Sequence, residues 1–139
     1  MDNFTLIFSF YCNSAARRKY LNFCIQSIQR SNKNNNFKVL VVDGSDPCNH
    51  GLNKNLFHNF QNLTMIHDEE KNPISRLHNH MKKIDTKYCL KILEDCLFID
   101  YDFSKIITND ISLLETKSEN TIIQYPTLID ENINIINNI

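Results

Sequence analysis

The residues best suited to chemistry in this chain are polar side chains that directly follow apolar runs. Ser9 and Tyr11 follow the first run, Asp43 follows the second, and Glu94 and Asp95 follow a later one. A base can stack on an aromatic ring, which contributes roughly 1–3 kcal/mol, and a carboxylate accepts hydrogen bonds from a nucleobase or ribose. Two adjacent carboxylates beside a diphosphate suit Mg²⁺ or Mn²⁺, because these ions prefer oxygen ligands. The residue types therefore indicate a nucleoside diphosphate and a divalent metal ion.

Each of these groups also has an ordinary structural interpretation. Asp43 precedes a Gly-Ser pair, and an Asp in that position often caps a turn through its own backbone. Tyr11 can be a core aromatic residue, and Glu94 and Asp95 can be the solvated end of a strand. Viewed one at a time, the groups leave these alternatives open. Their shared position after predicted strands is the observation that favours a common site.

Four apolar runs rich in β-branched and aromatic residues predict β-strands. They cover residues 4–10, 37–42, 63–67 and 88–93. The second run is almost uninterrupted in its apolar character, which is typical of a strand covered on both faces, as in a parallel sheet. The sequence that follows it, "DGSDP", contains the glycine and proline that end a strand in a sharp turn.

Apolar residues at helical spacing predict one helix between each pair of consecutive strands. The first helix follows a capping pair, Asn13 and Ser14, and the third begins at Pro73, where the missing N–H costs nothing. The apolar stripes are Leu21, Cys24, Ile25 and Ile28 in the first helix, Leu52, Leu56 and Phe60 in the second, and Ile74, Leu77, Met81 and Ile84 in the third. The predicted elements after the fourth strand are a helix with Ile106, Ile107, Ile111 and Leu114, and an edge strand at residues 121–125.

The alternation of strands and helices predicts an α/β fold. We expect an open, mostly parallel sheet with helices on both faces, in a single domain spanning residues 1–139. In such a sheet, ligands bind outside the carboxyl ends of the strands, near a reversal in strand order. That rule brings together the polar clusters at residues 9–11, 43–45 and 94–96. We therefore expect one shared site at this edge of the sheet.

The composition excludes several classes of function. Lys and Arg number 15 and Asp and Glu number 16, so no strong positive field is available for nucleic acid. With only two glycines, the chain cannot form a Gly-rich phosphate-binding loop. No basic residue precedes the N-terminal apolar run, and no stretch reaches the roughly 20 apolar residues of a membrane span. We therefore expect a cytoplasmic protein without a signal peptide or a membrane segment.

We expect structural roles, and no metal binding, for the cysteines and histidines. The five cysteines form no Cys-x-x-Cys pair, which indicates free thiols rather than a disulfide framework or a structural zinc site. His78 and His80 are too close in sequence to share a helical face, so they do not form a metal-ligand pair there.

Taken in order, the motifs of this chain resemble those of the family 2 glycosyltransferases of the GT-A fold. The resemblance covers about residues 4–103 and includes "TLIFSFY", with Ser9 and Tyr11, and "LNFCIQSI" in the first helix. It continues with "VVDGS" after the second strand, "KNPISRLHN" at the third helix, and "LEDC" in the place of the family's Asp-x-Asp metal motif. The resemblance implies a GT-A, Rossmann-like nucleotide-binding fold and a metal-dependent glycosyltransferase of the hexosyltransferase type.

The resemblance also implies roles for the candidate nucleotide-binding residues. Ser9, Tyr11 and Asp43 would hold the uridine or another nucleoside of a nucleotide-sugar donor, most simply a UDP-sugar. Arg76 or Lys71 would lie near the base or the diphosphate, and the sequence does not choose between them. These five residues come from three different segments, so their roles depend on the folded edge of the sheet.

The resemblance places a metal ion at the polar cluster of residues 94–96. Asp95 would be the main ligand of Mn²⁺ or Mg²⁺, with Glu94 supporting it or touching the ribose. The metal would act as a Lewis acid that stabilises the departing nucleoside diphosphate. Cys96 stands where the family often has a further carboxylate, and thiols are poor ligands for these ions. Cys12 and Pro73 also depart from the family pattern, which has Asn and Gly there.

The largest departure from the family is length. Family members continue into an acceptor-binding half that supplies the catalytic base, and no residue here matches a base motif. The base would come from the C-terminal tail, a homo-oligomer partner, or a separate acceptor-binding protein. Three hypotheses result: a transferase that glycosylates an acceptor hydroxyl, a catalytically silent nucleotide-sugar-binding module, and a scaffolding domain that kept only the fold.

Overall fold

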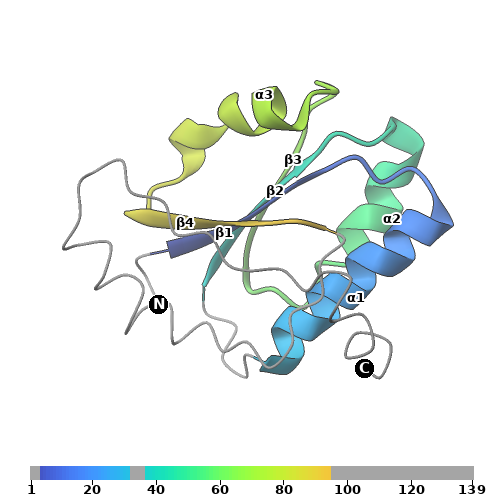
Figure 1. The fold of residues 1–139 in the computed structure, drawn as a ribbon, viewed down its shortest axis with the longest axis horizontal. Helices are drawn as coiled ribbons and strands as arrows, with labels where there is room; N and C mark the ends of the chain where they lie inside the picture. The colour runs from blue at the N-terminus through green and yellow to red at the C-terminus, as the bar shows by residue number, and fades with distance from the viewer. Residues whose placement is uncertain (1–3, 32–36, 95–139) are drawn as a thin grey trace, which may run out of the picture. The chain divides into compact units, whose positions relative to one another are not determined.

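The computed structural model describes residues 4–31 and 37–94, which form alternating strands and helices (Figure 1). The elements in chain order are β1 (Phe4–Phe10), α1 (Ala15–Ser31), β2 (Lys38–Asp43), the 3₁₀ turn η1 (Pro47–Asn49), α2 (His50–Asn55), β3 (Asn62–His67), α3 (Pro73–His78), the 3₁₀ turn η2 (Met81–Lys83) and β4 (Tyr88–Ile92). These elements belong to one compact unit, Met1–Ser104. The predicted helix with Ile106 and the predicted strand at 121–125 lie outside the described residues.

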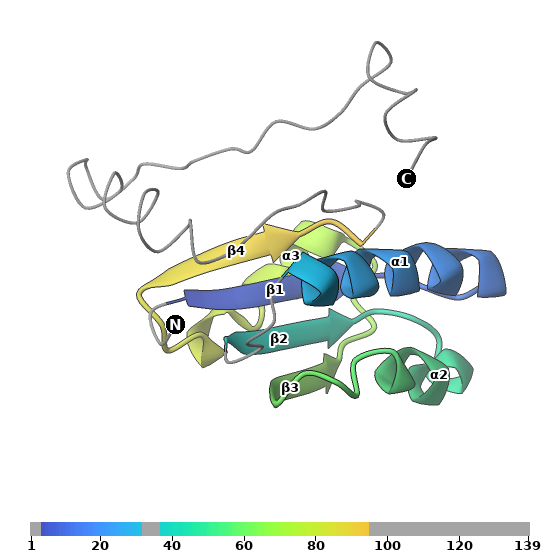
Figure 2. The same ribbon diagram turned by 90° about the horizontal axis from the view of Figure 1, so that it is seen from below.

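The four strands form one parallel sheet in the order β3-β2-β1-β4 (Figure 2). The chain moves outward from β1 to β2 and β3, then returns to the other side of β1 to add β4. The strand order therefore reverses between β1 and β4, where a ligand crevice is expected. Figure 1 shows α1 and α2 on one face of the sheet and α3 on the other. The predicted open parallel α/β sheet is confirmed.

The core forms on the face that α1 and α2 cover. The predicted stripe of α1 is confirmed, because Leu21, Cys24, Ile25 and Ile28 are all buried. The four residues Val39 to Val42 of β2 are also buried, as expected for a central strand covered on both faces. Ser14 caps α1, since its Oγ accepts a hydrogen bond of 3.2 Å from the backbone N–H of Arg17.

The predicted apolar stripe of the second helix is wrong except at Phe60. Leu52 is 53% exposed, and α2 ends at Asn55, before Phe60. The buried residues of this segment are Asn53, Phe57 and Phe60. Asn53 and Phe57 lie one position after the predicted Leu52 and Leu56, whereas Phe60 is buried as predicted. Asn53 can occupy a buried position because its side chain is hydrogen-bonded, so a count of apolar residues alone selects the wrong face.

The predicted third helix is too long. Helix α3 ends at His78, Ile74 is 72% exposed and Met81 is 39% exposed. The residue of α3 that is buried is Arg76, which is 1% exposed. The predicted start is confirmed: Pro73 is the first helical residue, and the Asn72 side chain accepts hydrogen bonds from the next two free backbone N–H groups. Helix α3 therefore presents a charged side chain, not an apolar stripe, to the sheet.

Candidate functional site

Ser9 lies at the carboxyl end of β1, on the face of the sheet that α3 covers. Its Oγ accepts a hydrogen bond of 3.2 Å from Nε of Arg76 and donates one of 3.3 Å to the carbonyl oxygen of Pro73. Ser9 is therefore buried as the link between β1 and the first turn of α3. The structure brings Ser9 and Arg76 together, and their role toward a nucleotide stays a prediction.

Arg76 is a buried cation held by neutral oxygens. Besides its bond to Ser9, its Nη1 donates a hydrogen bond of 2.7 Å to the carbonyl oxygen of Glu70. Within residues 4–31 and 37–94, no carboxylate lies within ion-pair distance of the guanidinium. Burial lowers the pKa of Arg76, and the more distant charges of Asp43 and Asp68 oppose that shift. The buried guanidinium therefore adds positive charge to this edge of the sheet, which would attract an anionic ligand.

Gly44 makes room for the Arg76 guanidinium. A Cβ atom placed on Gly44 would overlap Nη1 and Cζ of Arg76. Gly44 directly follows β2, and its backbone N–H donates a hydrogen bond of 2.8 Å to the carbonyl oxygen of Phe10. The glycine is therefore required for close approach of a side chain, which explains one of the two glycines in the chain.

Asp43 is fully buried and holds the turn that follows β2. Its Oδ1 accepts a hydrogen bond of 2.9 Å from the backbone N–H of Ser45, and its Oδ2 accepts one of 3.2 Å from Nδ2 of Asn53. The turn-capping interpretation of Asp43 is confirmed. Both carboxylate oxygens retain further acceptor capacity, and the role of Asp43 toward a nucleoside stays a prediction.

Asn53 connects the loops after β1 and β2 and was missed by the sequence analysis. Its Nδ2 lies 3.0 Å from the carbonyl oxygen of Cys12 and 3.1 Å from Oγ of Ser45, in addition to its contact with Asp43. Ser45 Oγ in turn accepts a hydrogen bond of 2.7 Å from the backbone N–H of Cys12. The available sequence signal was the helical spacing of Asn53 with Phe57, which places a polar residue on a buried face.

Tyr11 and Lys71 line a hollow at the carboxyl edge of the sheet. The hollow has a volume of about 200 Å³, and Glu69 and the residues 44–47 complete its walls. Tyr11 is 39% exposed, so its ring is available to a ligand and is not a core residue. The core interpretation of Tyr11 is therefore wrong. The structure places Tyr11 and Lys71 in one pocket, whereas Arg76 is buried beneath the neighbouring Gly44.

The fourth strand brings Glu94 toward the same edge. Strand β4 ends at Ile92, which lies beside Phe8 of β1, and Glu94 follows as a half-buried residue. Glu94 is one of the carboxylates whose charge acts on Arg76. Asp95 and Cys96 lie outside the described residues, so the metal site with Asp95 stays a prediction.

The loop between β3 and α3 is fixed by a half-buried contact between the side chains of Asp68 and His80. Oδ2 of Asp68 lies 2.8 Å from Nε2 of His80, and Oδ1 accepts a hydrogen bond of 3.0 Å from the backbone N–H of Glu70. The bond from the Glu70 backbone is the main cause of a lowered pKa of Asp68, and the bond from His80 adds to it. This pair holds the segment that carries Lys71 and the carbonyl oxygen bound by Arg76.

Two histidines beside Asp43 were also missed. The rings of His50 and His67 stack with centroids 3.7 Å apart and planes inclined by 13°. His67 is the last residue of β3 and lies opposite Asp43 in the sheet register. Burial lowers the pKa of His67, and the neighbouring His50 lowers it further. The rule that selected the ends of the other strands, applied to β3, would have identified His67.

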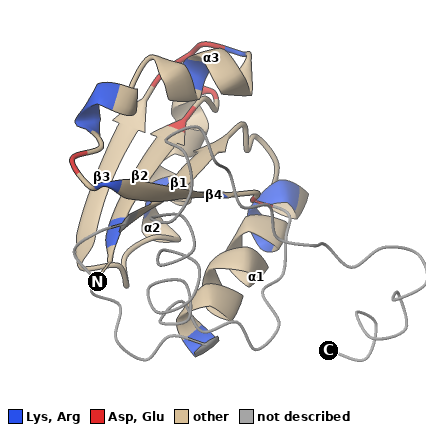
Figure 3. Cartoon of the chain, turned by 60° about the vertical axis from the view of Figure 1, so that its left-hand side comes forward, with Lys and Arg blue, Asp and Glu red and all other residues tan. Residues whose placement is uncertain are grey.

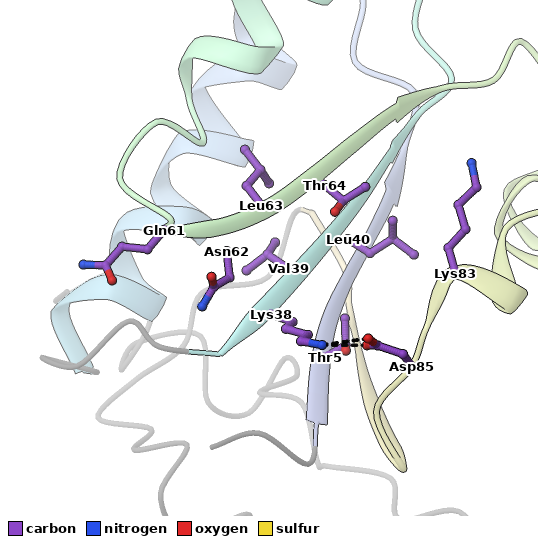
Figure 4. Close-up of a pocket in the computed structure, with 10 residues that line it drawn as sticks. All are labelled: Thr5, Lys38, Val39, Leu40, Gln61, Asn62, Leu63, Thr64, Lys83 and Asp85. Carbon is purple, nitrogen blue, oxygen red and sulfur yellow. Dashed lines mark hydrogen bonds and ion pairs between the residues drawn. The ribbon is translucent and has the colours of Figure 1, made fainter.

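A larger hollow of about 400 Å³ lies near the amino ends of the strands (Figure 4). Its lining includes Lys38 and Asp85, whose side chains form an exposed ion pair with atoms 2.8 Å apart. Volume alone would favour this hollow. We favour the carboxyl edge, because parallel sheets bind ligands there and because the buried Arg76 and Asp43 converge on it.

The charge at the carboxyl edge is local. Figure 3 shows basic and acidic segments interspersed around α3. Among the described residues, none of the helices is long and apolar enough to cross a membrane. Recognition of an anion at this edge therefore depends on individual side chains such as Arg76 and Lys71.

Comparisons with known proteins find matches among solved structures. No family model and no curated protein sequence matches the chain. The Staphylococcus aureus protein TarS, in a crystal structure of its residues 1–349, matches with a TM-score of 0.61 and 16% identity over 91% of this chain. Crystal structures of the same TarS fragment in complex with UDP and with UDP-GlcNAc match with TM-scores of 0.60 and 0.55, each at 15% identity over 89% of this chain.

This chain shares its fold with TarS. The aligned region is only 37–39% of the TarS 1–349 chains, so the chain spans less than two fifths of the structures that it matches. At this identity the likeness to TarS establishes the α/β fold that the motif order implied. The ligand and the reaction are inferences from the site.

Proposed function

We propose that this chain is the nucleotide-binding part of a glycosyltransferase that uses a UDP-sugar donor. The observation that carries the proposal is Arg76, a buried guanidinium to which residues 4–31 and 37–94 offer no carboxylate partner, beside Ser9 and Gly44 at the reversal of the strand order. The shared fold supports it, because TarS crystals contain UDP or UDP-GlcNAc. The sequence resemblance supplies the reaction class, a hexosyl transfer to an acceptor hydroxyl.

The residues divide into those that hold the nucleoside and those that hold the diphosphate. The exposed ring of Tyr11 offers a face for stacking the base, and Asp43 accepts hydrogen bonds near the end of β2. Lys71 lines the same hollow as Tyr11, and Arg76 supplies the buried positive charge. Ser9 fixes the direction of the Arg76 guanidinium through the Oγ–Nε hydrogen bond. In this assignment the exposed Lys71 contacts the diphosphate, and the charge of the buried Arg76 attracts it.

A divalent metal ion belongs to the proposal. Asp95, with Glu94 beside it, would hold Mn²⁺ or Mg²⁺ through carboxylate oxygens, the ligands that these ions prefer. When bound, the ion would stabilise the negative charge that develops on the departing nucleoside diphosphate. The half-buried Glu94 is close enough for its charge to act on Arg76, which supports a single site for metal and diphosphate.

The proposal is tested with UDP, a panel of UDP-sugars, Mn²⁺ and a chelator in thermal-shift and calorimetric measurements. We expect UDP with Mn²⁺ to raise the unfolding temperature, because a ligand at about 100 times its Kd stabilises a protein by about 2.7 kcal/mol. Arg76→Lys and Asp95→Asn should each weaken UDP binding at least about tenfold. Lys83→Gln, a change at an exposed residue in the wall of the other hollow, near the amino ends of the strands, is the control. Absence of UDP binding with Mn²⁺ present would disprove the proposal.

Sugar transfer is a separate step of the same test. The proposal includes an acceptor and a catalytic base, and it names neither. The base would come from the C-terminal tail, a homo-oligomer partner or a separate acceptor-binding protein. If UDP-sugar binds and neither hydrolysis nor transfer exceeds background, the chain is a nucleotide-sugar-binding module. If no nucleotide binds at all, a scaffolding role replaces both the transferase and the binding-module functions.

A further inference from the structure

Beside the proposed nucleotide site lies a second cluster of side chains with the chemistry of a metal centre. Asp43, His50 and His67 each offer one ligand atom, and these three atoms all lie within 4.8 Å of one another. Two imidazole nitrogens and a carboxylate oxygen form a donor set typical of zinc and neighbouring transition metals. The inference does not depend on the proposed transferase activity.

The backbone holds two of the three residues in fixed positions. Asp43 and His67 are register partners on the parallel strands β2 and β3, so their side chains leave the sheet side by side on the same face. His50 begins α2, and its ring stacks on that of His67 at 3.7 Å. The cluster is therefore built from three separate elements, all anchored to the described core.

The groups around the cluster orient its ligand atoms. Nε2 of His50 lies 2.8 Å from the carbonyl oxygen of Ser45. Because a carbonyl oxygen only accepts, the neutral ring carries its proton on Nε2 and keeps the lone pair of Nδ1 for a metal. The Asp43 carboxylate is fixed by the Ser45 backbone N–H and the Asn53 amide. Metal sites in proteins commonly have such outer hydrogen bonds to their histidine and carboxylate ligands.

Only a small movement would complete the site. Ligands at about 2.0–2.1 Å from a tetrahedral zinc ion lie about 3.3 Å apart, so the distances between the three ligand atoms have to shorten by up to about 1.5 Å. His67 is an exposed residue, so its side chain can rotate and separate the two stacked rings. One ring nitrogen of His67 and one of His50 can then bind the same ion. Asp43 is fully buried and need not move.

We propose that Asp43, His50 and His67 form a site for a transition-metal ion of the zinc class, distinct from the Mn²⁺ or Mg²⁺ site predicted at Asp95. Water or a ligand group completes the coordination shell, as in zinc sites with three protein ligands. Since Asp43 also belongs to the predicted nucleoside site, bound zinc fixes the carboxylate in its present position. Zinc binding itself requires no nucleotide.

The test uses the full chain, without nucleotide, and Zn²⁺ as the probe in competition with a chromophoric chelator. We expect one Zn²⁺ per chain. The affinity should fall at least about tenfold in His67→Ala and about a hundredfold in the His50→Ala/His67→Ala double variant. His78→Ala, a change at another exposed histidine, should bind zinc like the parent protein. Circular dichroism of each variant checks that the fold is retained, and neither histidine lies in the buried core.

Co²⁺ absorption identifies the ligands directly. Binding at this cluster gives visible d–d bands without thiolate charge-transfer absorption, and the bands disappear in the double variant. Cys48 lies two residues before His50 and is exposed, so a thiolate band would show a different, cysteine-based site and overturn the proposal. Zinc affinity that is equal in the parent and the double variant would overturn it as well.

Discussion

At the scale of single residues, the candidate site depends on the contact between Gly44 and Arg76. The guanidinium occupies the volume that a side chain at position 44 would need, and it is held there by Ser9 and Glu70. A methyl group at Gly44 therefore displaces a buried charge from its hydrogen bonds. Loss of partners by a buried polar group costs about 1–3 kcal/mol.

We expect Gly44→Ala to lower the free energy of unfolding by about 1–3 kcal/mol and to weaken UDP binding. Urea denaturation and calorimetry measure the two effects. Gly51→Ala is the matched control, because nothing lies within 4 Å of a Cβ at that helical position. Alanine there should raise the free energy of unfolding by about 0.5–1 kcal/mol. Equal effects of the two substitutions would contradict the close approach of Arg76 to Gly44.

At the scale of elements, the loop from β3 to α3 is positioned by the Asp68–His80 pair. The loop carries Lys71 and Glu70, and so it determines where two parts of the candidate site lie. The pKa of Asp68 lies below its ordinary value of 3.8, because the Glu70 backbone N–H and the His80 ring stabilise its charged form. A lowered carboxyl pKa in the folded state means that ionised Asp68 stabilises the fold.

We expect Asp68→Asn to lower the free energy of unfolding by about 1–2 kcal/mol at neutral pH. The folded-state pKa is depressed, so this stabilisation is fully present above pH 3.8 and is lost as the pH falls through the lower value. Urea denaturation of parent and variant between about pH 7 and pH 3 measures the difference, which should shrink only at the acid end. The control Glu69→Gln should show no such convergence, and a difference independent of pH would contradict the assignment.

The elements also show where sequence patterns succeed. The strands and α1 were predicted well, because their buried positions are almost all apolar, as in the Leu21 to Ile28 stripe. The patterns failed for α2 and α3, which bury Asn53 and Arg76. These polar residues are stabilised by hydrogen bonds to distant segments, and a local apolar pattern carries no information about such partners.

At the scale of the whole molecule, an aromatic cluster joins α2 to the sheet. Phe57 stacks on Phe10 with centroids 5.9 Å apart and meets Phe8 edge-on at 5.2 Å. The Phe57 side chain is fully buried, although it lies two residues after the end of α2. The cluster therefore connects the loop network around Asn53 with the hydrophobic core.

We expect Phe57→Ala to lower the free energy of unfolding by about 3–5 kcal/mol, because it removes a large buried side chain and leaves a cavity. Leu52→Ala, on the exposed side of α2, should change it by no more than about 0.5 kcal/mol. Urea denaturation of both variants decides between the observed core face and the face that the sequence pattern predicted. A larger effect at Leu52 would contradict the observed orientation of α2.

The sequence by itself determined the order of the elements, the parallel sheet, and the edge at which Ser9, Tyr11, Asp43 and Glu94 gather. These follow from apolar periodicity and from the geometry of parallel strands, which are properties of local sequence and of chirality. Only the tertiary structure decided that Arg76 is buried against Gly44, that Asn53 links two loops, and that His50 and His67 meet beside Asp43. Each of these contacts joins side chains from different elements, and the packing of the elements determines which side chains meet. The spacing of residues along the chain therefore does not predict these contacts.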